Sequence, residues 1–305
     1  MPTRVILDTD IGTDVDDCLA LAFILGSPEL QLEGITCVYG DVGLRARMAR
    51  RLLELRGRGD IPVLQGAREP LLGLRPVYWE GHEGQGLVGP EEEDEGPGGD
   101  AEDAVDYLVR TVVENPEQIH LIAIGPLTNV ALAFKRDPRV VRDLAHLTIM
   151  GGVARGPGSL HLPYVEHNIR CDPEAAHIVL TAGAPVTLVP LDVTTRVRIT
   201  PEHVARIKAA GTPFHAAVAD QVGRYPRFGR LGYTYLHDPL AAAVVVQPDI
   251  VGLETVHVDV ELGGRLAAGA TLLRQPTDDA PANARVALDV DVARAEEFVV
   301  GRVAS

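Results

Sequence analysis

The stretch Asp8-Thr9-Asp10-Ile11-Gly12-Thr13-Asp14-Val15-Asp16-Asp17 follows the apolar run Val5-Ile6-Leu7 and carries five carboxylates in ten residues. Side chains alternate along a strand, so Asp8 and Asp10 are expected on one face, and Gly12 permits a tight turn that returns the later acids toward them. One or two acids could cap the following helix, at about 1 kcal/mol each, but capping does not account for five. Crowded carboxylates need an offsetting cation, and oxygen ligands select hard ions such as Ca²⁺ or Mg²⁺. The stretch therefore predicts a cation site, with helix capping and a solvated acidic turn as the alternative.

Short β-branched runs alternate with helical patterns through the first two-thirds of the chain. The expected buried strands are residues 4–7, 32–38, 61–64, 119–124, 144–150 and 186–189. The expected helices between them are residues 17–25, 44–55, 101–114, 127–134 and 173–181. This alternation predicts an α/β fold with an open, mainly parallel, Rossmann-like sheet flanked by helices. Ligands of such sheets bind beyond the carboxyl ends of the strands.

The last third of the chain predicts additional C-terminal helices and strands. A helical region at 201–247 precedes strand-like segments and a short helix, which are expected at residues 256–261, 270–273, 285–290 and 293–300. Residues 80–100 are rich in glycine and acids and predict a surface loop. Because no repeat and no linker divides the sequence, we expect residues 1–305 to form one domain.

Composition limits the classes of partner. The 28 basic and 43 acidic residues give a formal net charge of −15, which repels phosphates and anionic membrane surfaces. We therefore expect neither nucleic acid nor a membrane as a partner. The three widely spaced cysteines fit reduced thiols and have no zinc-site spacing. Met1 leads directly into an apolar run without the features of a secretory signal, so the expected location is cytoplasmic.

A second acidic motif, Leu236-His237-Asp238-Pro239, precedes the apolar run 240–246. Alone it indicates a helix N-cap, although an aspartate can cap a helix and bind a cation at once. With the first motif and several others, it resembles the inosine-uridine-preferring nucleoside hydrolase family over nearly the whole chain. The other motifs that match in the family's order are Val38-Tyr39-Gly40-Asp41, His82 in a Gly-rich loop, Gly125-Pro126-Leu127-Thr128-Asn129, Met150-Gly151-Gly152, Glu166-His167-Asn168 and Asp172-Pro173-Glu174-Ala175-Ala176.

The resemblance implies a calcium-dependent enzyme that hydrolyses ribonucleosides to ribose and free base, assembled as a homotetramer or homodimer. It implies that Ca²⁺ is bound by the side chains of Asp10, Asp17 and Asp238 and by the backbone carbonyl of Ile124. Water and the two ribose diol oxygens would fill the remaining positions. The implied catalytic residues are Asp16, as general base, and His237, which would assist the leaving base. The positions expected to contact substrate are Asp41, His82, Met150, Glu166 and Asn168.

The chemistry explains why these residue types are needed. Breaking an N-glycosidic bond builds positive charge on the ribose, so nearby carboxylates stabilise the oxocarbenium-like transition state. The implied calcium would hold an attacking water and lower its pKa, and Asp16 would accept its proton. With an ordinary pKa of about 6.5, His237 would protonate the departing base near neutral pH.

Two positions depart from the family pattern. Asp41 stands where many relatives have asparagine, which adds a negative charge near the expected ribose site, and Leu160 replaces an asparagine six residues before Glu166. The handling of the 5′-hydroxyl and the choice of base therefore stay open. An aromatic and basic stretch before His237 could contact a base or serve ordinary packing or an interface; its members are Tyr225, Arg227, Phe228, Arg230, Tyr233 and Tyr235.

Two alternatives come from other classes of protein. Asp8-Thr9-Asp10 at a strand end resembles the motif of haloacid dehalogenase-type phosphotransferases. That chemistry needs a downstream lysine, and neither Lys135 nor Lys208, the two lysines of the chain, lies in a suitable motif. A nucleoside- or sugar-binding protein without turnover is the second alternative, against which the presence of Asp16 and His237 argues.

Overall fold

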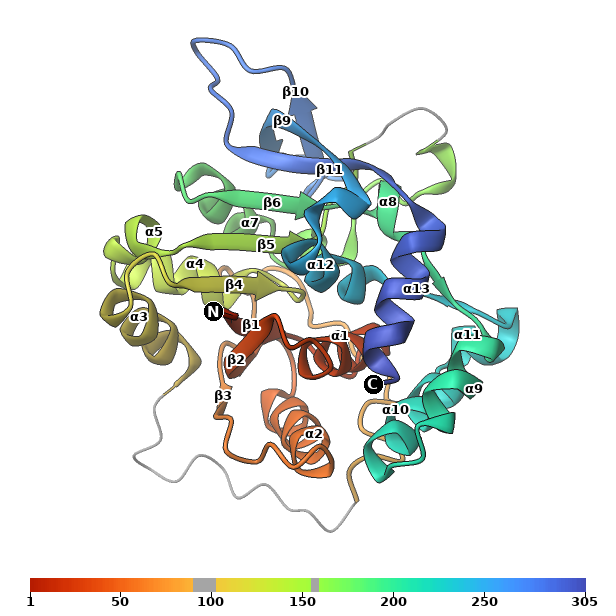
Figure 1. Cartoon of the computed structure of the whole chain (residues 1–305). Coiled ribbons are helices and arrows are strands. Elements are labelled where there is room, and N and C mark those ends of the chain that lie inside the picture. Colours follow the sequence, from red (N-terminus) through yellow and green to blue (C-terminus); the bar gives the residue numbers. More distant parts are fainter. Residues whose placement is uncertain (90–102, 155–158) are drawn as a thin grey trace.

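The structure, a computed structural model, describes residues 1–89, 103–154 and 159–305 (Figure 1). Within these residues, nine strands form the main sheet in the order β10-β9-β11-β6-β5-β4-β1-β2-β3. Their bounds are β1 Thr3–Thr9, β2 Leu30–Cys37, β3 Val63–Gln65, β4 Ile119–Ala123, β5 His146–Met150, β6 Val186–Val189, β9 Val251–Val260, β10 Thr271–Arg274 and β11 Ala284–Val290. From β3 through to β11 neighbouring strands are parallel, whereas β9 is antiparallel to both of its neighbours. The prediction of a mainly parallel α/β sheet is confirmed.

Helices flank this sheet, and a small second sheet pairs β7 Arg198–Ile199 with β8 Thr234–Tyr235. The helices up to β6 are α1 Asp16–Leu25, α2 Val42–Leu55, α3 Ala104–Glu114, α4 Thr128–Arg136, α5 Arg139–Asp143, α6 His167–Cys171 and α7 Pro173–Thr181. The later helices are α8 Leu191–Thr194, α9 Pro201–Ala209, α10 Pro213–Arg224, α11 Pro226–Leu231, α12 His237–Val246 and α13 Val292–Val303. Two short 3-10 helices span Ser159–His161 and Pro248–Ile250.

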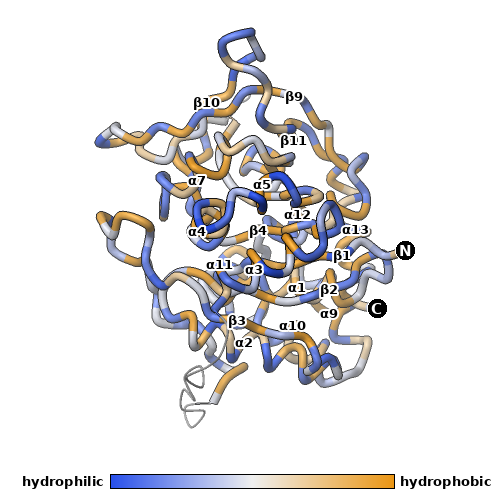
Figure 2. The backbone as a smooth tube through the Cα atoms, turned by 90° about the vertical axis from the view of Figure 1, so that its left-hand side faces the viewer, coloured by the Kyte–Doolittle hydropathy of each residue, from blue (hydrophilic) through white to orange (hydrophobic). Residues whose placement is uncertain are grey.

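The sheet separates two hydrophobic cores, because alternate residues of a strand point to opposite faces. In β1, Val5 and Leu7 join the core formed with α1, α12 and α13, whereas Ile6 joins the core formed with α3, α4 and α7. The outer helices α3 and α4 alternate between hydrophobic and hydrophilic residues (Figure 2), as helices with one buried face do.

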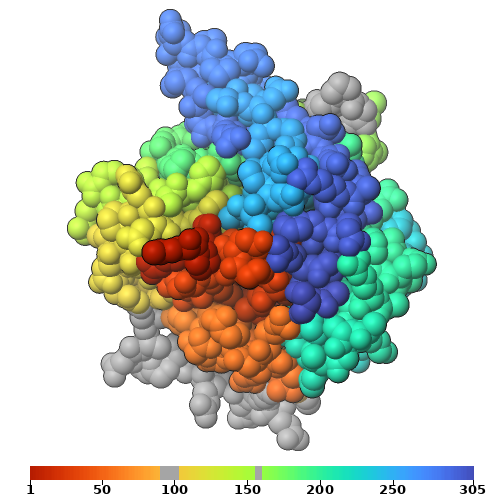
Figure 3. Space-filling model, viewed as in Figure 1, coloured from red at the N-terminus to blue at the C-terminus, as the bar shows by residue number. Residues whose placement is uncertain are grey.

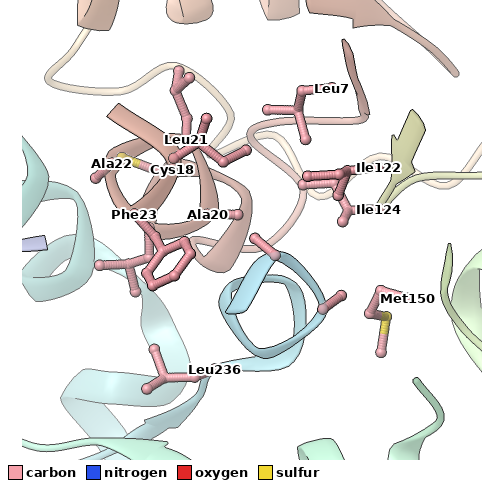
Figure 4. Close-up of a cluster of buried hydrophobic side chains, with 14 of the residues drawn as sticks. Leu7, Cys18, Ala20, Leu21, Ala22, Phe23, Ile122, Ile124, Met150 and Leu236 are labelled. Atoms are coloured by element: carbon pink, nitrogen blue, oxygen red, sulfur yellow. The ribbon is translucent and has the colours of Figure 1, made fainter. Parts of the chain in front are cut away.

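Helices α1 and α12 are instead buried along most of their length and pack against each other. Their residues are apolar nearly all round, which is typical of a helix inside a core. Figure 4 shows α12 among side chains from β1, α1 and β4, including Leu7, Phe23 and Ile122. Because α1 begins with Asp16 and α12 with His237, the polar residues of both helices lie at their N-terminal ends.

The two ends of the chain meet on one face of the molecule. In Figure 3 the C-terminal segment lies directly beside the N-terminal part of the chain. Ser305 Oγ donates a hydrogen bond to the Gly26 carbonyl, and Arg302 forms an ion pair with Glu29. The prediction that residues 1–305 form one domain stays a prediction.

Most of the expected elements are present, with shifted ends. Strand β9 begins at Val251, earlier than expected, and β7 and β8 were not expected because two-residue strands have no readable period. Of the predicted surface loop, half of residues 80–89 are exposed, and residues 90–100 lie outside the described residues. None of the helices in the described ranges has both the length and the apolar character needed to cross a bilayer.

Candidate active site

A cluster of buried carboxylates lies where β1 ends and where α1 and α12 begin. One oxygen from each of Asp16, Asp17 and Asp238 lies within 4.8 Å of the others, and all three residues are buried. Asp10 is buried in the same cavity. Asp238 is more than two hundred positions away along the sequence, so the fold brings together both ends of the predicted ligand set. The arrangement offers a concentrated set of oxygen ligands.

The carboxylates of this cluster are electrostatically unfavourable on their own. Burial raises the pKa values of Asp16, Asp17 and Asp238 well above their ordinary range, and the negative charges of neighbouring aspartates raise them further. Burial likewise raises the pKa of Asp8, beneath the cluster, to about 7. Such groups are offset by bound protons or by a cation, and a hard cation matches a set of oxygen ligands. The residues therefore fit a divalent ion such as Ca²⁺.

Arg45 of α2 holds the acidic turn in place. Its side chain is fully buried and donates hydrogen bonds to the carbonyls of Tyr39 at 2.6 Å, Ile11 at 2.9 Å and Asp10. A further hydrogen bond reaches Thr13 Oγ1 at 2.9 Å. The guanidinium also lowers the pKa of the Asp17 carboxyl, although burial and Asp10 act more strongly in the opposite direction. Sequence reasoning missed Arg45, because an arginine on an amphipathic helix ordinarily lies on the solvent side.

The floor of the cluster is a hydrogen-bond network under β1. Asp8 Oδ2 accepts hydrogen bonds from Thr36 Oγ1 at 2.6 Å and from Asn129 Nδ2 at 2.8 Å. Thr9 Oγ1 donates to Asp17, which ties the strand end to the first turn of α1. Asp8 thus belongs to the support of the site and does not line the cavity. Asn129 ends the motif Gly125-Pro126-Leu127-Thr128-Asn129, to which sequence analysis gave no role, and its hydrogen bond to Asp8 gives this residue a structural role.

A second network lies at the ends of β4 and β5. Asn168 Nδ2 donates to the carbonyl of Ile124 at 2.8 Å and to that of Met150 at 3.2 Å. Since a carbonyl oxygen has two lone pairs, the Ile124 carbonyl keeps capacity for a cation. The Glu166 carboxylate caps α6 and accepts backbone hydrogen bonds from Asn168, Ile169 and Gly152. Both Glu166 oxygens therefore have backbone partners, and a substrate contact for this residue stays a prediction.

His237 is partly buried at the start of α12. Its Nδ1 is hydrogen-bonded to Thr194 Oγ1 at 2.7 Å, and its ring lies 5.2 Å from that of Tyr235. Burial, with a contribution from Arg227, lowers the pKa of His237 to about 3. The expectation that His237 has an ordinary pKa and protonates the base near neutral pH is therefore wrong in this respect. The imidazole is neutral and can act as a hydrogen-bond donor or acceptor.

A cavity of about 1020 Å³ opens beyond the carboxyl ends of β1, β4, β5 and β6. The cavity brings together nine of the predicted site residues, namely Asp10, Asp16, Asp17, Ile124, Met150, Glu166, Asn168, His237 and Asp238. Its position agrees with the binding edge expected of an open parallel sheet. Residues that sequence reasoning did not single out also line it, among them Tyr78, Trp79 and Arg198.

Two predicted substrate contacts lie elsewhere. Asp41 is exposed, caps α2 by accepting a hydrogen bond from the Leu44 N–H at 2.9 Å, and does not line the cavity. Its extra negative charge is exposed to solvent, and a substrate contact for Asp41 stays a prediction. His82 lies in a neighbouring hollow, with its ring 6.1 Å from that of Tyr225. Tyr225 borders both spaces and donates a hydrogen bond to Asp14 Oδ2 at 2.8 Å.

Comparison with known proteins adds an independent line of evidence. Residues 5–297 match the family model described as inosine-uridine preferring nucleoside hydrolase. The chain is 36% identical over 300 residues to the pyrimidine-specific ribonucleoside hydrolase RihA of Citrobacter koseri, covering 95% of each chain. It is 33% identical to uridine nucleosidase 1 of Arabidopsis thaliana, covering 89% of this chain and 82% of the relative.

Solved structures give the same result. A plant nucleoside hydrolase, PpNRh1, superimposes with a TM-score of 0.87 at 31% identity, covering 100% of both chains. A purine-preferring ribonucleoside hydrolase from Gardnerella vaginalis superimposes with a TM-score of 0.82 at 28% identity, covering 99% of this chain and 98% of that one. The base preferences in the names of these relatives differ, so the likeness alone does not identify the base that this chain prefers.

Proposed function

The chain belongs to the family of inosine-uridine preferring nucleoside hydrolases, and we propose that it splits ribonucleosides into ribose and free base with the help of a bound calcium ion. The observation that carries the proposal is the convergence of carboxylates from the start and the far end of the chain. Asp17 and Asp238 are buried together, and Asp10 lies in the same cavity. A capping role does not require so many buried acids.

We propose that the side chains of Asp10, Asp17 and Asp238 and the carbonyl of Ile124 hold the ion. When bound, calcium would orient the two ribose diol oxygens and an attacking water and lower the pKa of that water. Two observations support Asp16 as the general base. Its carboxylate borders the cavity, and it is oriented by a hydrogen bond of 3.2 Å from the Asp238 N–H. In this role Asp16 accepts the proton of the water as its oxygen attacks C1′.

The surrounding residues would favour the transition state over the neutral substrate. Positive charge develops on the ribose as the bond to the base lengthens, and the acidic wall of the cavity stabilises that charge. Asn168 is oriented by its hydrogen bonds to the backbone at the end of β4 and β5, which supports a positioning role beside the sugar. Neutral His237 would contact the departing base through its ring nitrogen that is not bonded to Thr194.

We also propose a cytoplasmic location, a role in nucleoside salvage, and assembly into a homodimer or homotetramer. The cysteines Cys18, Cys37 and Cys171 are free and buried, which is compatible with a reducing compartment. Sedimentation of the purified protein would measure the assembly directly. The phosphotransferase alternative is set aside because the family model matches nearly the whole chain.

A reducing-sugar assay tests the proposed function. We expect ribose release from at least one common ribonucleoside, loss of that activity in a chelator, and its return with added Ca²⁺. The matching 2′-deoxynucleoside should react far more slowly, because it lacks one of the two diol oxygens. Binding of ribonucleosides without sugar release during long incubation would instead support the non-catalytic alternative.

A further inference from the structure

One part of the cavity, next to α6, has mostly apolar walls. We call it the α6 arm; the residues that line it are Val77, Tyr78, Leu162, Val165, His167 and Cys171. The segment before α6 and the segment after β3 face each other here, because the Tyr78 ring lies 5.5 Å from that of His167 and Val77 packs against the small cluster that contains Cys171. The arm is therefore a second compartment of the cavity, chemically unlike the carboxylate cluster.

The proposed function determines which part of a nucleoside points into this arm. The ribose diol lies at the carboxylate cluster, and C1′ faces Asp16 and His237 at the starts of α1 and α12. In a ribofuranose ring, C2′ and C3′ stand between C1′ and C4′, so C4′ and C5′ point away from these two residues. They point toward the end of β5 and the start of α6, where Asn168 is hydrogen-bonded to the carbonyls of Ile124 and Met150. The α6 arm begins beyond this position.

The polar side chains beside C5′ are already bonded to the backbone. Both Glu166 oxygens accept backbone hydrogen bonds, and both N–H groups of the Asn168 amide are donated to carbonyls. Leu160, which departs from the family pattern, is 97% exposed and does not line the cavity. Neither Glu166 nor Asn168 therefore has a donor left for a 5′-oxygen, and binding at this wall does not depend on a 5′-hydroxyl.

We propose that the α6 arm accepts an apolar 5′-substituent, so that the enzyme also hydrolyses 5′-deoxy-5′-alkylthio ribonucleosides. An alkylthio group is uncharged and matches the apolar walls, and each methylene-sized group that leaves water strengthens binding by about fourfold. The cavity of about 1020 Å³ lies at the upper end of the range of about 300–1,000 Å³ that is usual for small-molecule sites, so it has room for the substituent beside a nucleoside. This inference rests on the proposed function and extends its substrate class at the 5′ end, whichever base is preferred.

The charges around the arm favour a neutral substituent over a phosphate. The carboxylates of the cluster and of Glu166 line the same cavity and repel a phosphate dianion. Of the arginines that line this side, Arg75 is already paired with Glu174 at 2.9 Å, and Arg170 is exposed. A 5′-phosphate would therefore lose its hydration without gaining a buried cationic partner, whereas a thioether has little hydration to lose.

The bonds that form and break are those of the proposed hydrolysis. The oxygen of water bonds to C1′ and one of its protons passes to Asp16, while the electron pair of the C1′–N bond leaves with the base, which takes up a proton from solvent. The bond between C5′ and sulfur stays intact. The products are the free base and a 5-deoxy-5-alkylthioribose, which is a reducing sugar and is detected by the same assay as ribose.

A series of substrates that share one base, the base that the wild-type protein releases fastest, tests the inference. We expect kcat/KM for the 5′-deoxy compound to lie within about tenfold of that for the parent ribonucleoside, because at most one net hydrogen bond is lost. The 5′-methylthio compound should exceed the 5′-deoxy compound by about threefold or more. The 5′-monophosphate should be at least about 100-fold poorer than the parent, because of the carboxylates that it would face.

Two substitutions of Val165, which is half-buried in the arm wall, probe the contact with the substituent. Val165→Thr keeps the size of the side chain and replaces a methyl group with a hydroxyl, so the ratio of kcat/KM for the 5′-methylthio and 5′-deoxy compounds should fall by about 3- to 10-fold. Val165→Ala enlarges the arm and should favour a 5′-propylthio over a 5′-methylthio compound by a few-fold relative to wild type, about fourfold for each additional methylene that is buried. Val113→Thr is the matched control, because Val113 is half-buried in α3 and does not line the cavity, and it should keep the wild-type ratios.

Ratios between substrates separate a contact with the substituent from a general loss of folded protein, which lowers all values equally. A 5′-methylthio compound that reacts more slowly than its 5′-deoxy counterpart, or ratios that stay the same in both Val165 variants, would overturn the inference while leaving the proposed function standing. A 5′-monophosphate that reacts faster than the parent would also overturn it and would indicate an anion site at the rim near Arg170 instead. If the wild-type protein releases sugar from no ribonucleoside, the proposed function itself fails.

Discussion

Single carboxylates in the site are distinguished by their partners. Asp8 is bonded to Thr36 and Asn129 beneath the cluster, and Asp17 accepts a hydrogen bond from Thr9. Asp16 borders the cavity, and its carboxylate accepts a hydrogen bond from the backbone N–H of Asp238. These partners agree with the proposed roles: Asp16 can accept a proton in the cavity, Asp17 holds the ion, and Asp8 supports the strand beneath.

Asp16→Asn keeps the size of the side chain and removes the base. We expect kcat for the best ribonucleoside to fall by about 10²- to 10⁴-fold, the usual contribution of general base catalysis. Calcium binding, measured by isothermal titration calorimetry, should largely persist, whereas Asp10→Asn should lose calcium binding and activity together. Wild-type turnover in Asp16→Asn would reject the assignment of the base.

Arg45→Met tests the support of the acidic turn. Loss of the guanidinium leaves the buried carbonyls of Ile11 and Tyr39 without donors and removes a positive charge near Asp17. We expect the free energy of unfolding to fall by about 3 kcal/mol or more in urea titrations, because each unsatisfied buried group costs about 1–3 kcal/mol. Arg51→Met, at an exposed position on the same helix, should change stability by less than about 0.5 kcal/mol. Equal stability of the two variants would show that Arg45 does not support the turn.

The chemistry of single residues was predictable only in part. The crowded aspartates of residues 8–17 predict a cation site, because helix capping does not account for five carboxylates. The pKa of His237 was not predictable, since it depends on burial beside α8 and on Arg227, which sequence spacing does not encode. Asp41 belongs to one of the family motifs, yet in the structure it is exposed and caps α2.

At the level of elements, the site forms where the N-termini of two buried helices meet the end of β1. Periodicity located α1 and most of α12 because long apolar runs are easy to read. Neither the contact between the two helices nor the short strands β7 and β8 has a signal in the sequence. Arg198 and Tyr235 are placed at the cavity wall by that short pairing, so sequence analysis left the role of Tyr235 open and did not single out Arg198.

The parallel strands β4 and β5 carry a pair of histidines whose titration should affect stability. His120 and His146 are register partners, and burial lowers the pKa of His120 to about 3 and that of His146 below its ordinary value. The unfolded chain, with a histidine pKa of about 6.5, then binds more protons between pH 3 and 6.5. The stability that depends on neutral His120 is complete above pH 6.5 and is lost as the pH falls.

His120→Gln removes this titration and keeps a polar group near Thr148, the hydrogen-bond partner of His120 Nε2. Relative to wild type, the free energy of unfolding of the variant should fall less between pH 6.5 and 4.5, by up to about 2 kcal/mol. Urea titrations at several pH values measure the difference. Parallel pH dependence in the two proteins would contradict the effect.

At the scale of the whole molecule, the topology explains why distant acids converge. The parallel order carries the ends of β1, β4, β5 and β6 to one edge of the sheet, and α12 returns Asp238 to the start of α1. Strand alternation made the parallel sheet predictable. The antiparallel extension by β9 and β10 was not predictable, because the hydrophobic pattern of a strand does not show which edge of the sheet the strand joins.

Calcium should stabilise the folded chain, because the unfolded chain separates the ligands. At about 100 times the dissociation constant the gain is about 2.7 kcal/mol, which corresponds to a rise in Tm of about 5 °C for a protein of this size. Differential scanning calorimetry with calcium and with chelator measures it. Asp238→Asn should lose most of the rise, and an equal rise in this variant would place the ion elsewhere.

A crystal structure determined in calcium, with the ion located by anomalous scattering, tests the central claim most directly. We expect one ion with carboxylate oxygens of Asp10, Asp17 and Asp238 at about 2.3–2.6 Å, the usual range for calcium. Three carboxylates that stay metal-free at saturating calcium, in crystals of active protein, would contradict it.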